Sequence, residues 1–154
     1  MDHLTVTAEP YLAAQELTLA SVTEMRAMYA IEDDFTDVAG HHFDPPDGVF
    51  VVARLDGSPV GCGGLRRFDA RSAEIKRMYT DPSVRSRGVA RRVLDALFDQ
   101  ARAIGYTRVV LETGTLQPHA IALYRSAGFR SMPCYGHYVH DPYSVCFEKE
   151  LSSV

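Results

Sequence analysis

The sequence contains no tryptophan and only three cysteines. No apolar run in it approaches the roughly 20 residues that span a bilayer. Cys62, Cys134 and Cys146 are odd in number and lack C-x-x-C spacing, which argues against a disulfide framework and against a zinc site. The first ten residues, MDHLTVTAEP, lack the basic and apolar regions of a signal peptide. We therefore expect a cytoplasmic protein with no membrane partner.

Positive charge is also scarce, because the sequence has 16 Lys and Arg residues against 20 Asp and Glu residues, and the formal net charge is -4. A nucleic-acid-binding domain carries a basic patch or stripe. This chain has no long basic run, so we expect no nucleic acid among its partners. Arg85, Arg87, Arg91 and Arg92 do form a local cluster. Such a cluster suits a phosphorylated cofactor better than a duplex.

Two common phosphate-binding loops are absent. The Walker loop needs G-x-x-x-x-G-K-[ST], and the sequence has no Gly-Lys pair; the dinucleotide fingerprint needs G-x-G-x-x-G, and the candidate turn has only Gly88. The histidines cluster as His41 with His42 and as His137 with His140. Neither cluster has the carboxylate–histidine spacing of a catalytic metal site, so we expect no metal.

The composition that remains is that of one ordinary globular domain. The chain has 154 residues, 46% hydrophobic and 23% charged, with no repeat or linker, so residues 1–154 are predicted to be a single domain. A mixed α/β sheet packed by helices is the expected architecture. The apolar pattern predicts strands at 3–8, 49–55, 59–66, 73–80, 107–113 and 144–151, one long or two short helices at 11–31, a polar loop at 32–47 and a helix at Val89–Ile104.

The most informative segment is VRSRGVARRVL, residues 84–94, which follows a strand-like run and opens a helix. Arg85, Gly88 and Ala90 form an R-x-x-G-x-A turn. Glycine lets the backbone approach a ligand closely, and a helix start aims unpaired N–H groups and its positive dipole end at the same point. The segment therefore predicts an anion site suited to a phosphate or pyrophosphate.

The R-x-x-G-x-A turn resembles the acetyl-CoA loop of the GNAT superfamily of N-acyltransferases. Three other segments resemble the family in the same order: the strand pair joined by Asp56-Gly57, the helix LQPHAIALYRSAGFR, and the last strand SVCFEKEL. EIKRMYTDP and LETGTLQPHAIALY are similar to a subgroup of small bacterial members with poorly defined acceptors. The resemblance implies an acetyl-CoA-dependent N-acetyltransferase. It also implies the GNAT fold, a mixed, mostly antiparallel central sheet with a parallel splayed strand pair, flanked by helices.

The same resemblance implies acetyl-CoA as co-substrate, bound by two parts of the chain. Main-chain groups of the strand before the turn grip the pantetheine arm, and the turn with the helix start holds the pyrophosphate. Gln117 stands where many relatives have asparagine, a departure that could weaken a polar contact to the arm. The implied cofactor-binding residues are Met78, Tyr79, Thr80, Arg85, Ser86, Arg87, Gly88, Val89, Ala90, Arg91 and Gln117.

Acetyl transfer to an amine needs a proton acceptor for the amine, donors for the oxyanion and a proton for the leaving thiolate. Glu74, on the strand that leads into the turn, matches the glutamate that some family members use as general base. It could act directly or through water. Its competing role is that of a structural carboxylate paired with Lys76. Strand alternation predicts Glu74, Lys76 and Met78 on one face and Ile75, Arg77 and Tyr79 on the other.

Tyr124 matches the tyrosine that many GNAT enzymes place beside the cofactor sulfur as general acid. Its phenol can donate a hydrogen bond to the leaving thiolate. Its competing role is that of a helix tyrosine packed in the core. Residues 134–143 are predicted to form a loop over the acceptor site, or to pack without a role there.

Two other functions remain open. One is a non-catalytic module that binds an acyl-CoA, and the other is a ping-pong acyltransferase with Cys134 as nucleophile. The leading prediction is direct transfer in a ternary complex to the amine of a small molecule, and a homodimer stays open. The residues disagree about that acceptor: Asp33, Asp34 and Asp37 favour a cationic amine, whereas Lys76 and Arg77 would receive a carboxylate.

Overall fold

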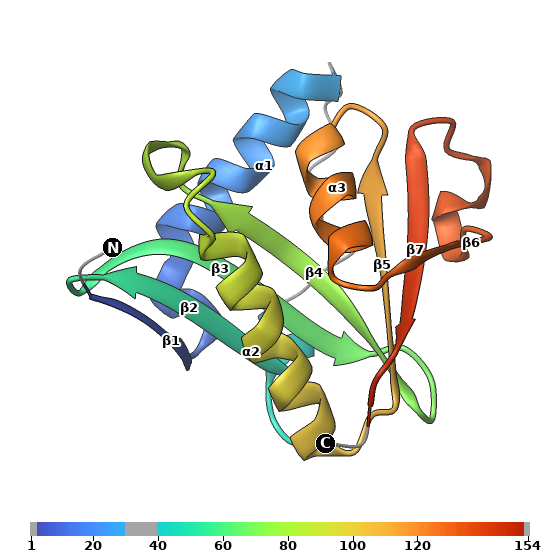
Figure 1. The fold of residues 1–154 in the computed structure, drawn as a ribbon, viewed down its shortest axis with the longest axis horizontal. Helices are drawn as coiled ribbons and strands as arrows, with labels where there is room; N and C mark the ends of the chain where they lie inside the picture. The colour runs from blue at the N-terminus through green and yellow to red at the C-terminus, as the bar shows by residue number, and fades with distance from the viewer. Residues whose placement is uncertain (1–2, 30–39, 153–154) are drawn as a thin grey trace.

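The computed structural model describes residues 3–29 and 40–152, and the strands in them form one seven-stranded sheet (Figure 1). The strand order is β1-β2-β3-β4-β5-β7-β6. The strands are β1 (Leu4–Ala8), β2 (Val49–Leu55), β3 (Ser58–Arg67), β4 (Ser72–Thr80), β5 (Arg108–Gly114), β6 (Arg130–Met132) and β7 (Ser144–Glu150). The α-helices are α1 (Gln15–Tyr29), α2 (Val89–Ile104) and α3 (Pro118–Ser126), and the 3-10 turns are η1 (Tyr11–Ala14), η2 (Gly40–Phe43), η3 (Pro82–Val84) and η4 (Gly136–His140).

One pair of neighbouring strands is parallel, and the other pairs of this sheet are antiparallel. The parallel strands β4 and β5 pair only as far as Ile75 opposite Leu111. Beyond that point both strands continue without pairing to each other, and Figure 1 shows them diverging. This arrangement confirms the predicted fold class.

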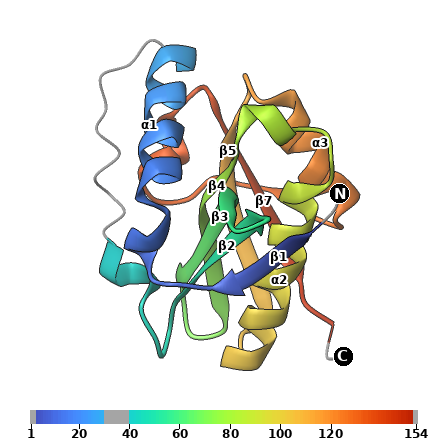
Figure 2. The same cartoon turned by 90° about the vertical axis from the view of Figure 1, so that its left-hand side faces the viewer.

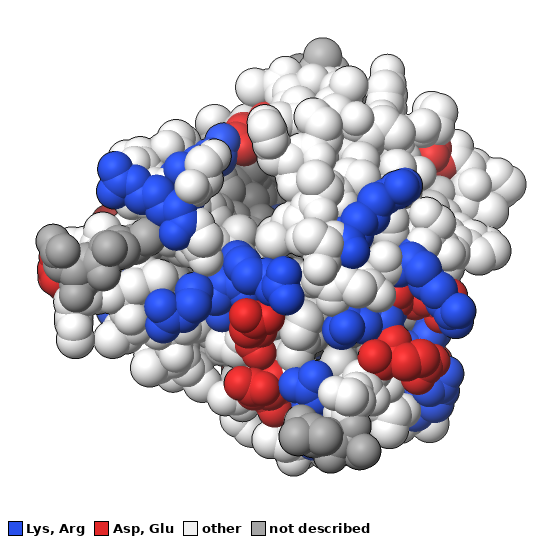
Figure 3. Space-filling model, viewed as in Figure 1, with Lys and Arg blue, Asp and Glu red and all other residues white. Residues whose placement is uncertain are grey.

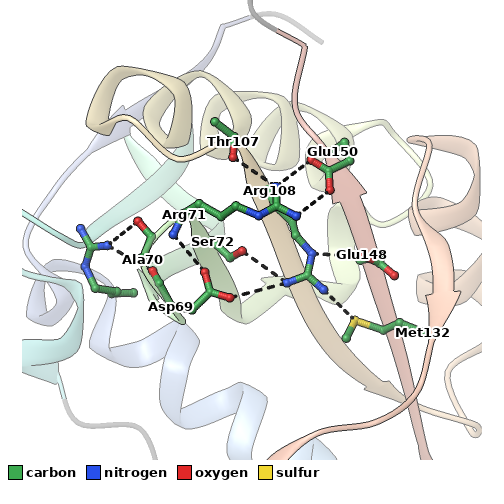
Figure 4. Close-up of polar contacts among 10 residues, drawn as sticks. Asp69, Ala70, Arg71, Ser72, Thr107, Arg108, Met132, Glu148 and Glu150 are labelled. Carbon is green, nitrogen blue, oxygen red and sulfur yellow. Dashed lines mark hydrogen bonds and ion pairs between the residues drawn. The ribbon is translucent and has the colours of Figure 1, made fainter.

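Arginines hold the paired end of β4 and β5 together (Figure 4). Arg108 of β5 donates to Glu148 of β7 at 3.1 Å and to Ser72 of β4 at 3.3 Å. Arg71, just before β4, donates to the two carboxylate oxygens of Glu150 of β7 at 3.0 and 3.1 Å. These contacts tie β4, β5 and β7 together at one end, so the opening between β4 and β5 lies at the other.

Helices cover both faces of the sheet, with α1 on one side and α2 and α3 on the other (Figure 2). The larger core cluster lies under α2, where Val93, Leu94 and Leu97 are fully buried. Burial of each such side chain stabilises the fold by about 1.5–3 kcal/mol. A smaller cluster, which includes Phe43 and Phe50, lies on the side of η1 and α1. Buried side chains therefore pack against both faces of the sheet that contains the opening between β4 and β5.

Most of the predicted elements are confirmed. The helix predicted at Val89–Ile104 is α2, and it ends at Gly105, whose φ of 113° is left-handed. Asp56 and Gly57, with φ of 51° and 90°, form the predicted hairpin turn between β2 and β3. The helix predicted at 11–31 begins as η1 and continues as α1, and its last residues lie outside the described part of the chain. β6 escaped prediction because three residues are too few to show alternation.

The predicted alternation along β4 is wrong after Lys76. The register with β3 shifts there, and Arg77 has a φ of 62°, so one extra residue is inserted as a β-bulge. Met78 consequently joins Ile75 at the core under α2, whereas Tyr79 packs against the smaller cluster beside α1. The bulge lies just where β4 leaves β5, and it redirects the side chains of the open segment.

The sequence-based argument against a disulfide is also wrong. Cys134 and Cys146 form one, with their Cα atoms 5.1 Å apart. The pairing of β6 with β7 places Met132 opposite Cys146, which brings the chain after β6 alongside β7. The odd count was misleading because the remaining cysteine, Cys62, is buried in β3 as a free thiol.

Candidate active site

The predicted phosphate turn lies between β4 and α2. Asp81 accepts hydrogen bonds from the backbone N–H of Ser83 at 2.9 Å and from its hydroxyl at 2.6 Å, and so caps η3. Ser86 and Gly88 then adopt left-handed φ values of 65° and 82°. A Cβ at Gly88 would meet no atom within 4 Å, so the backbone angle and not space requires glycine there.

The start of α2 presents backbone donors to this turn. The first N–H groups of a helix, here those of Val89, Ala90 and Arg91, have no partner inside the helix. Figure 3 shows Lys and Arg side chains gathered over the start of α2, beside a hollow in this face. Arg85 is held in place, since it donates to the Thr80 carbonyl at 3.0 Å and pairs with Glu24 of α1 at 2.7 Å. The segment therefore has the donors and the positive charge that a pyrophosphate requires.

A cavity of about 300 Å³ occupies the opening between β4 and β5; we call it the splay cavity. Its walls come from the open ends of both strands, from α1 and α3 and from the loop before β7. Met78 and Gln117, both predicted to bind the cofactor arm, line it. Gln117 precedes α3, and its amide lies 3.5 Å from the Tyr29 hydroxyl of α1.

Tyr124 of α3 also lines the splay cavity. The residue is 6% exposed, and its ring packs on Phe129 and Phe147 at centroid distances of 5.7 and 6.4 Å. Burial, followed by the negative charge of Glu112, raises the pKa of the phenol above its usual value. Tyr124 therefore keeps its proton at neutral pH, as a proton donor must.

Glu74 lines a second, larger cavity of about 600 Å³, which we call the outer cavity. Both oxygens of its carboxylate are engaged: Arg66 of β3 donates to one at 2.9 Å, and the hydroxyl of Tyr135 donates to the other at 2.8 Å. Glu74 is 3% exposed. The structural ion pair that the sequence analysis assigned to Lys76 is thus made with Arg66, because β3 places it directly opposite Glu74.

The loop between β6 and β7 contacts β4 through two tyrosines. Tyr135 reaches Glu74, and the hydroxyl of Tyr138 accepts a hydrogen bond from Lys76. The disulfide fixes the start of this loop to β7, and it removes the Cys134 thiol that a ping-pong mechanism would use. Cys62 is no substitute nucleophile, because burial raises its pKa to about 12.

Glu112 of β5 is an ionisable residue of the site that sequence reasoning did not name. It lines the splay cavity together with Tyr124, and its carboxylate accepts a hydrogen bond from the Ser144 hydroxyl at 2.8 Å. Burial raises its pKa to about 7. The signal in the sequence was a single carboxylate at the end of the apolar strand RVVLETG.

The sequence analysis also made predictions about a metal, a membrane partner and the charge of the acceptor. Within residues 3–29 and 40–152, no three His, Cys, Asp or Glu side chains are grouped so as to hold a metal ion. No helix in the same ranges is both long and apolar enough to cross a bilayer. Asp33, Asp34 and Asp37, which favoured a cationic acceptor, lie outside the described residues.

The opened parallel strand pair, with the predicted phosphate turn at its end, is the arrangement that the resemblance to the GNAT superfamily implied. The family model of the acetyltransferase (GNAT) family matches residues 12–129, and the chain belongs to that family. The predicted enzyme class, N-acetyltransferase, and the predicted co-substrate of the family, acetyl-CoA, are confirmed by this membership.

Named relatives are bacterial and vertebrate. The chain is 42% identical over 107 residues to an IAA acetyltransferase of Azospirillum brasilense, covering 69% of this chain and 70% of that protein. It is 34% identical over 111 residues to human N-acetylaspartate synthetase, covering 71% of this chain and 37% of that protein.

Solved structures share the fold. An acyl-CoA N-acyltransferase structure from Klebsiella pneumoniae superposes with a TM-score of 0.78 at 28% identity, covering 97% of this chain and 98% of that one. A GNAT acetyltransferase from Elizabethkingia anophelis, solved with acetyl-CoA bound, has a TM-score of 0.70 at 18% identity, covering 98% and 100%.

Proposed function

We propose that this protein transfers the acetyl group of acetyl-CoA directly to the amine of a small molecule in a ternary complex. One observation carries the proposal. The splay cavity, which contains Tyr124, adjoins the outer cavity, which contains Glu74, and His137 and Tyr138 line both. Two adjoining cavities support the simultaneous binding of a cofactor and an acceptor, which direct transfer requires.

The chemistry follows from this arrangement. The pantetheine arm lies along β4 beyond Ile75, where backbone groups that face the opening no longer pair with β5. The amine nitrogen attacks the thioester carbonyl carbon, and backbone N–H groups beside the arm stabilise the oxyanion. The carbon–sulfur bond then breaks, and Tyr124 gives its phenolic proton to the thiolate.

Glu74 is proposed to define the acceptor side. Its burial and its place in the outer cavity support that position. The sequence analysis predicted that Glu74 is the general base. In that role, Glu74 must break its hydrogen bond with Arg66 or with Tyr135 when the amine binds. Breaking either hydrogen bond costs free energy, so the base role requires a rearrangement of these contacts.

The acceptor is proposed to be a small polar amine. The outer cavity is lined by basic groups, including Arg66 and Arg67, and by acidic groups, including Asp44 and Asp47. Neither sign of charge dominates this lining. One relative is named for N-acetylaspartate, so amino acids belong among the first candidates alongside simple amines.

The test is release of free CoA thiol from acetyl-CoA in the presence of amines and amino acids, together with thermal unfolding with and without CoA. We expect CoA to raise the melting temperature, because a ligand that binds only the native state stabilises it. We also expect thiol release that depends on an amine. A CoA-dependent shift without thiol release for any amine would instead favour the non-catalytic module, and no shift would overturn both readings.

A further inference from the structure

We propose that the disulfide between Cys134 and Cys146 is a reducible tether, which holds the loop that lines both cavities and lets a dithiol release that loop. Reduction should weaken binding of the acceptor amine and spare binding of CoA. The inference rests on the proposed function, because that function defines which side of the site receives the amine. It adds a condition under which that side is formed.

The loop consists of residues 135–143, which we call the tethered loop; it contains η4 and ends where β7 begins. The two cysteines are 12 residues apart, so the ring that their disulfide closes contains the whole segment. Four residues of the tethered loop line the outer cavity and four line the splay cavity, and His137 and Tyr138 belong to both sets. Every residue that this loop contributes to the two cavities therefore lies inside the disulfide ring.

The two ends of the tethered loop are attached to the sheet differently. At its far end β7 begins, and the Thr115 N–H donates to the Tyr143 carbonyl at 2.8 Å. Before its start lies β6, an edge strand of three residues whose last pair joins Met132 to Cys146 (Figure 1). Short segments at an edge open easily, because few contacts hold them. The disulfide at Cys134 therefore supports the weaker of the two ends.

The other end of the disulfide lies beside the opening of the sheet. Cys146 is 1% exposed and pairs in register with Glu112 of β5. The pairing of β5 with β4 ends one residue earlier, at Leu111. The tether thus joins the loop to the part of β7 that flanks the opening between β4 and β5. A change in the tether consequently acts next to the site.

The contacts of the tethered loop indicate what reduction would release. Three backbone hydrogen bonds within residues 135–144, of 3.0 to 3.2 Å, are internal. The loop contacts β4 through Tyr135, which donates to Glu74, and through Tyr138, which accepts from Lys76. The internal bonds keep the local shape of the loop but do not fix its place on the sheet. Without the tether, that place depends on side-chain contacts that water can replace.

The two sulfur atoms differ in exposure, which gives the exchange a direction. Cys134 is half-buried, whereas Cys146 is buried. A thiolate of the dithiol attacks Sγ of Cys134, the bond between the cysteines breaks, and Cys146 leaves as a thiolate that takes up a proton. The second thiolate of the dithiol then attacks the mixed disulfide and releases Cys134. Two electrons and two protons pass to the protein, and the dithiol becomes a cyclic disulfide.

Cys62, the third cysteine of the chain, stays outside this exchange. It is buried in β3, its thiol donates to the Arg77 carbonyl at 3.4 Å, and burial raises its pKa to about 12. A thiol that keeps its proton is a poor nucleophile. The oxidised chain, once denatured, should therefore titrate one thiol, and the reduced chain all three.

The first test follows the loop itself, by hydrogen exchange of the whole protein with and without dithiothreitol. We expect the reductant to speed exchange in peptides that cover residues 135–143 and to leave peptides of α2 unchanged. Cys134→Ser should exchange fast in this loop without reductant, because it lacks the disulfide and keeps the buried Cys146 in place. Cys62→Ala is the matched control, and its loop should respond to the reductant as the wild type does.

The second test measures the acceptor side through the acetylated product, because the reductant obscures thiol release. Reduction should raise the KM for the amine by roughly 5- to 100-fold, the scale of ordering about two side chains on binding. The rise in melting temperature with CoA should persist, since the predicted phosphate turn lies at the start of α2. Cys134→Ser should show the high KM with and without dithiothreitol.

Three outcomes overturn the proposal while amine-dependent transfer by the wild type still stands. They are three titratable thiols in the protein kept under air, unchanged hydrogen exchange of the loop on reduction, and an unchanged KM for the amine. Loss of the CoA shift on reduction also overturns it, because the released segment would then include the cofactor side. Failure of both forms to acetylate any amine overturns the proposed function instead, and hydrogen exchange then decides whether the disulfide holds the loop.

Discussion

Glu74 and Glu112 lie on one face of one sheet, yet their surroundings give them different chemistry. Glu74 meets an arginine and a phenol that occupy both carboxylate oxygens. Glu112 stands where the sheet opens and meets one hydroxyl. The first environment fixes the carboxylate in place by two hydrogen bonds, whereas burial in the second raises the pKa of Glu112. The pairing of β4 with β5 ends between these two positions, so Glu74 lies in the paired part of the sheet and Glu112 in the opened part.

The two cavities around these residues divide the proposed reaction in the same way. The splay cavity holds the sulfur side, with Tyr124 and the cofactor turn beyond it, and the outer cavity holds the acceptor side. Variants on the sulfur side should change cofactor binding and turnover. Variants in the outer cavity should act mainly on stability and on the KM for the amine.

The largest effect is expected from Gly88→Glu. The variant places bulk and negative charge at the predicted pyrophosphate site, so the thermal shift with CoA should disappear and activity should fall below detection. Gly57→Glu is a matched control, since Gly57 also has a left-handed φ of 90° and open space but lies in the β2–β3 turn. Retention of the CoA shift in Gly88→Glu would contradict the assignment of the turn.

Tyr124→Phe should come next. It keeps the ring packing and removes the phenolic proton, so turnover should fall by roughly 10- to 10⁴-fold while CoA binding persists. Tyr106→Phe is the control, because Tyr106 is a buried tyrosine whose hydroxyl donates to the Asp47 carbonyl at 2.7 Å, away from the splay cavity. Equal rates in the two variants, with chemistry rate-limiting, would make Tyr124 a packing residue.

Stability should respond to pH through Glu112. Its folded-state pKa of about 7 is above its ordinary value of 4.5, so the folded protein holds a proton that the unfolded chain has lost between those pH values. Folding stability therefore falls as the pH rises through that range, by an amount on the order of 3 kcal/mol. Urea unfolding at about pH 8 should show Glu112→Gln to be more stable than the wild type. Equal stability there would mean that the carboxylate is well solvated.

Glu74→Gln should have the smallest effect on chemistry. The amide leaves Arg66 without its anionic partner, so the free energy of unfolding should fall by about 2 kcal/mol. The rate per folded molecule should remain within a few-fold of the wild type, measured at saturating amine. A large loss of turnover in a stable Glu74→Gln variant would support the base role that the match of Glu74 to the family position indicated.

Local pattern was enough for much of the fold. The bounds of α2 follow from its apolar spacing and from Gly105, and the β2–β3 turn follows from Asp56-Gly57, because both signals act over a few residues. The turn at Gly88 was predictable for the same reason, and its role in binding the cofactor stays a prediction. The bulge at Arg77 was not, since it depends on how β4 must pair with β3 while leaving β5.

The sequence by itself determined the turn at Gly88 and predicted an anion site there, because the signal is local, and the resemblance to the family predicted a proton donor in Tyr124; both roles stay predictions. Only the tertiary structure decided which carboxylate is held by charge and which is left in a cavity. Arg66, Tyr135 and Ser144 come from separate strands and a loop, and their approach to Glu74 and Glu112 is set by sheet register. The disulfide of Cys134 with Cys146 was decided in the same way, because the β6–β7 pairing brings two distant cysteines together.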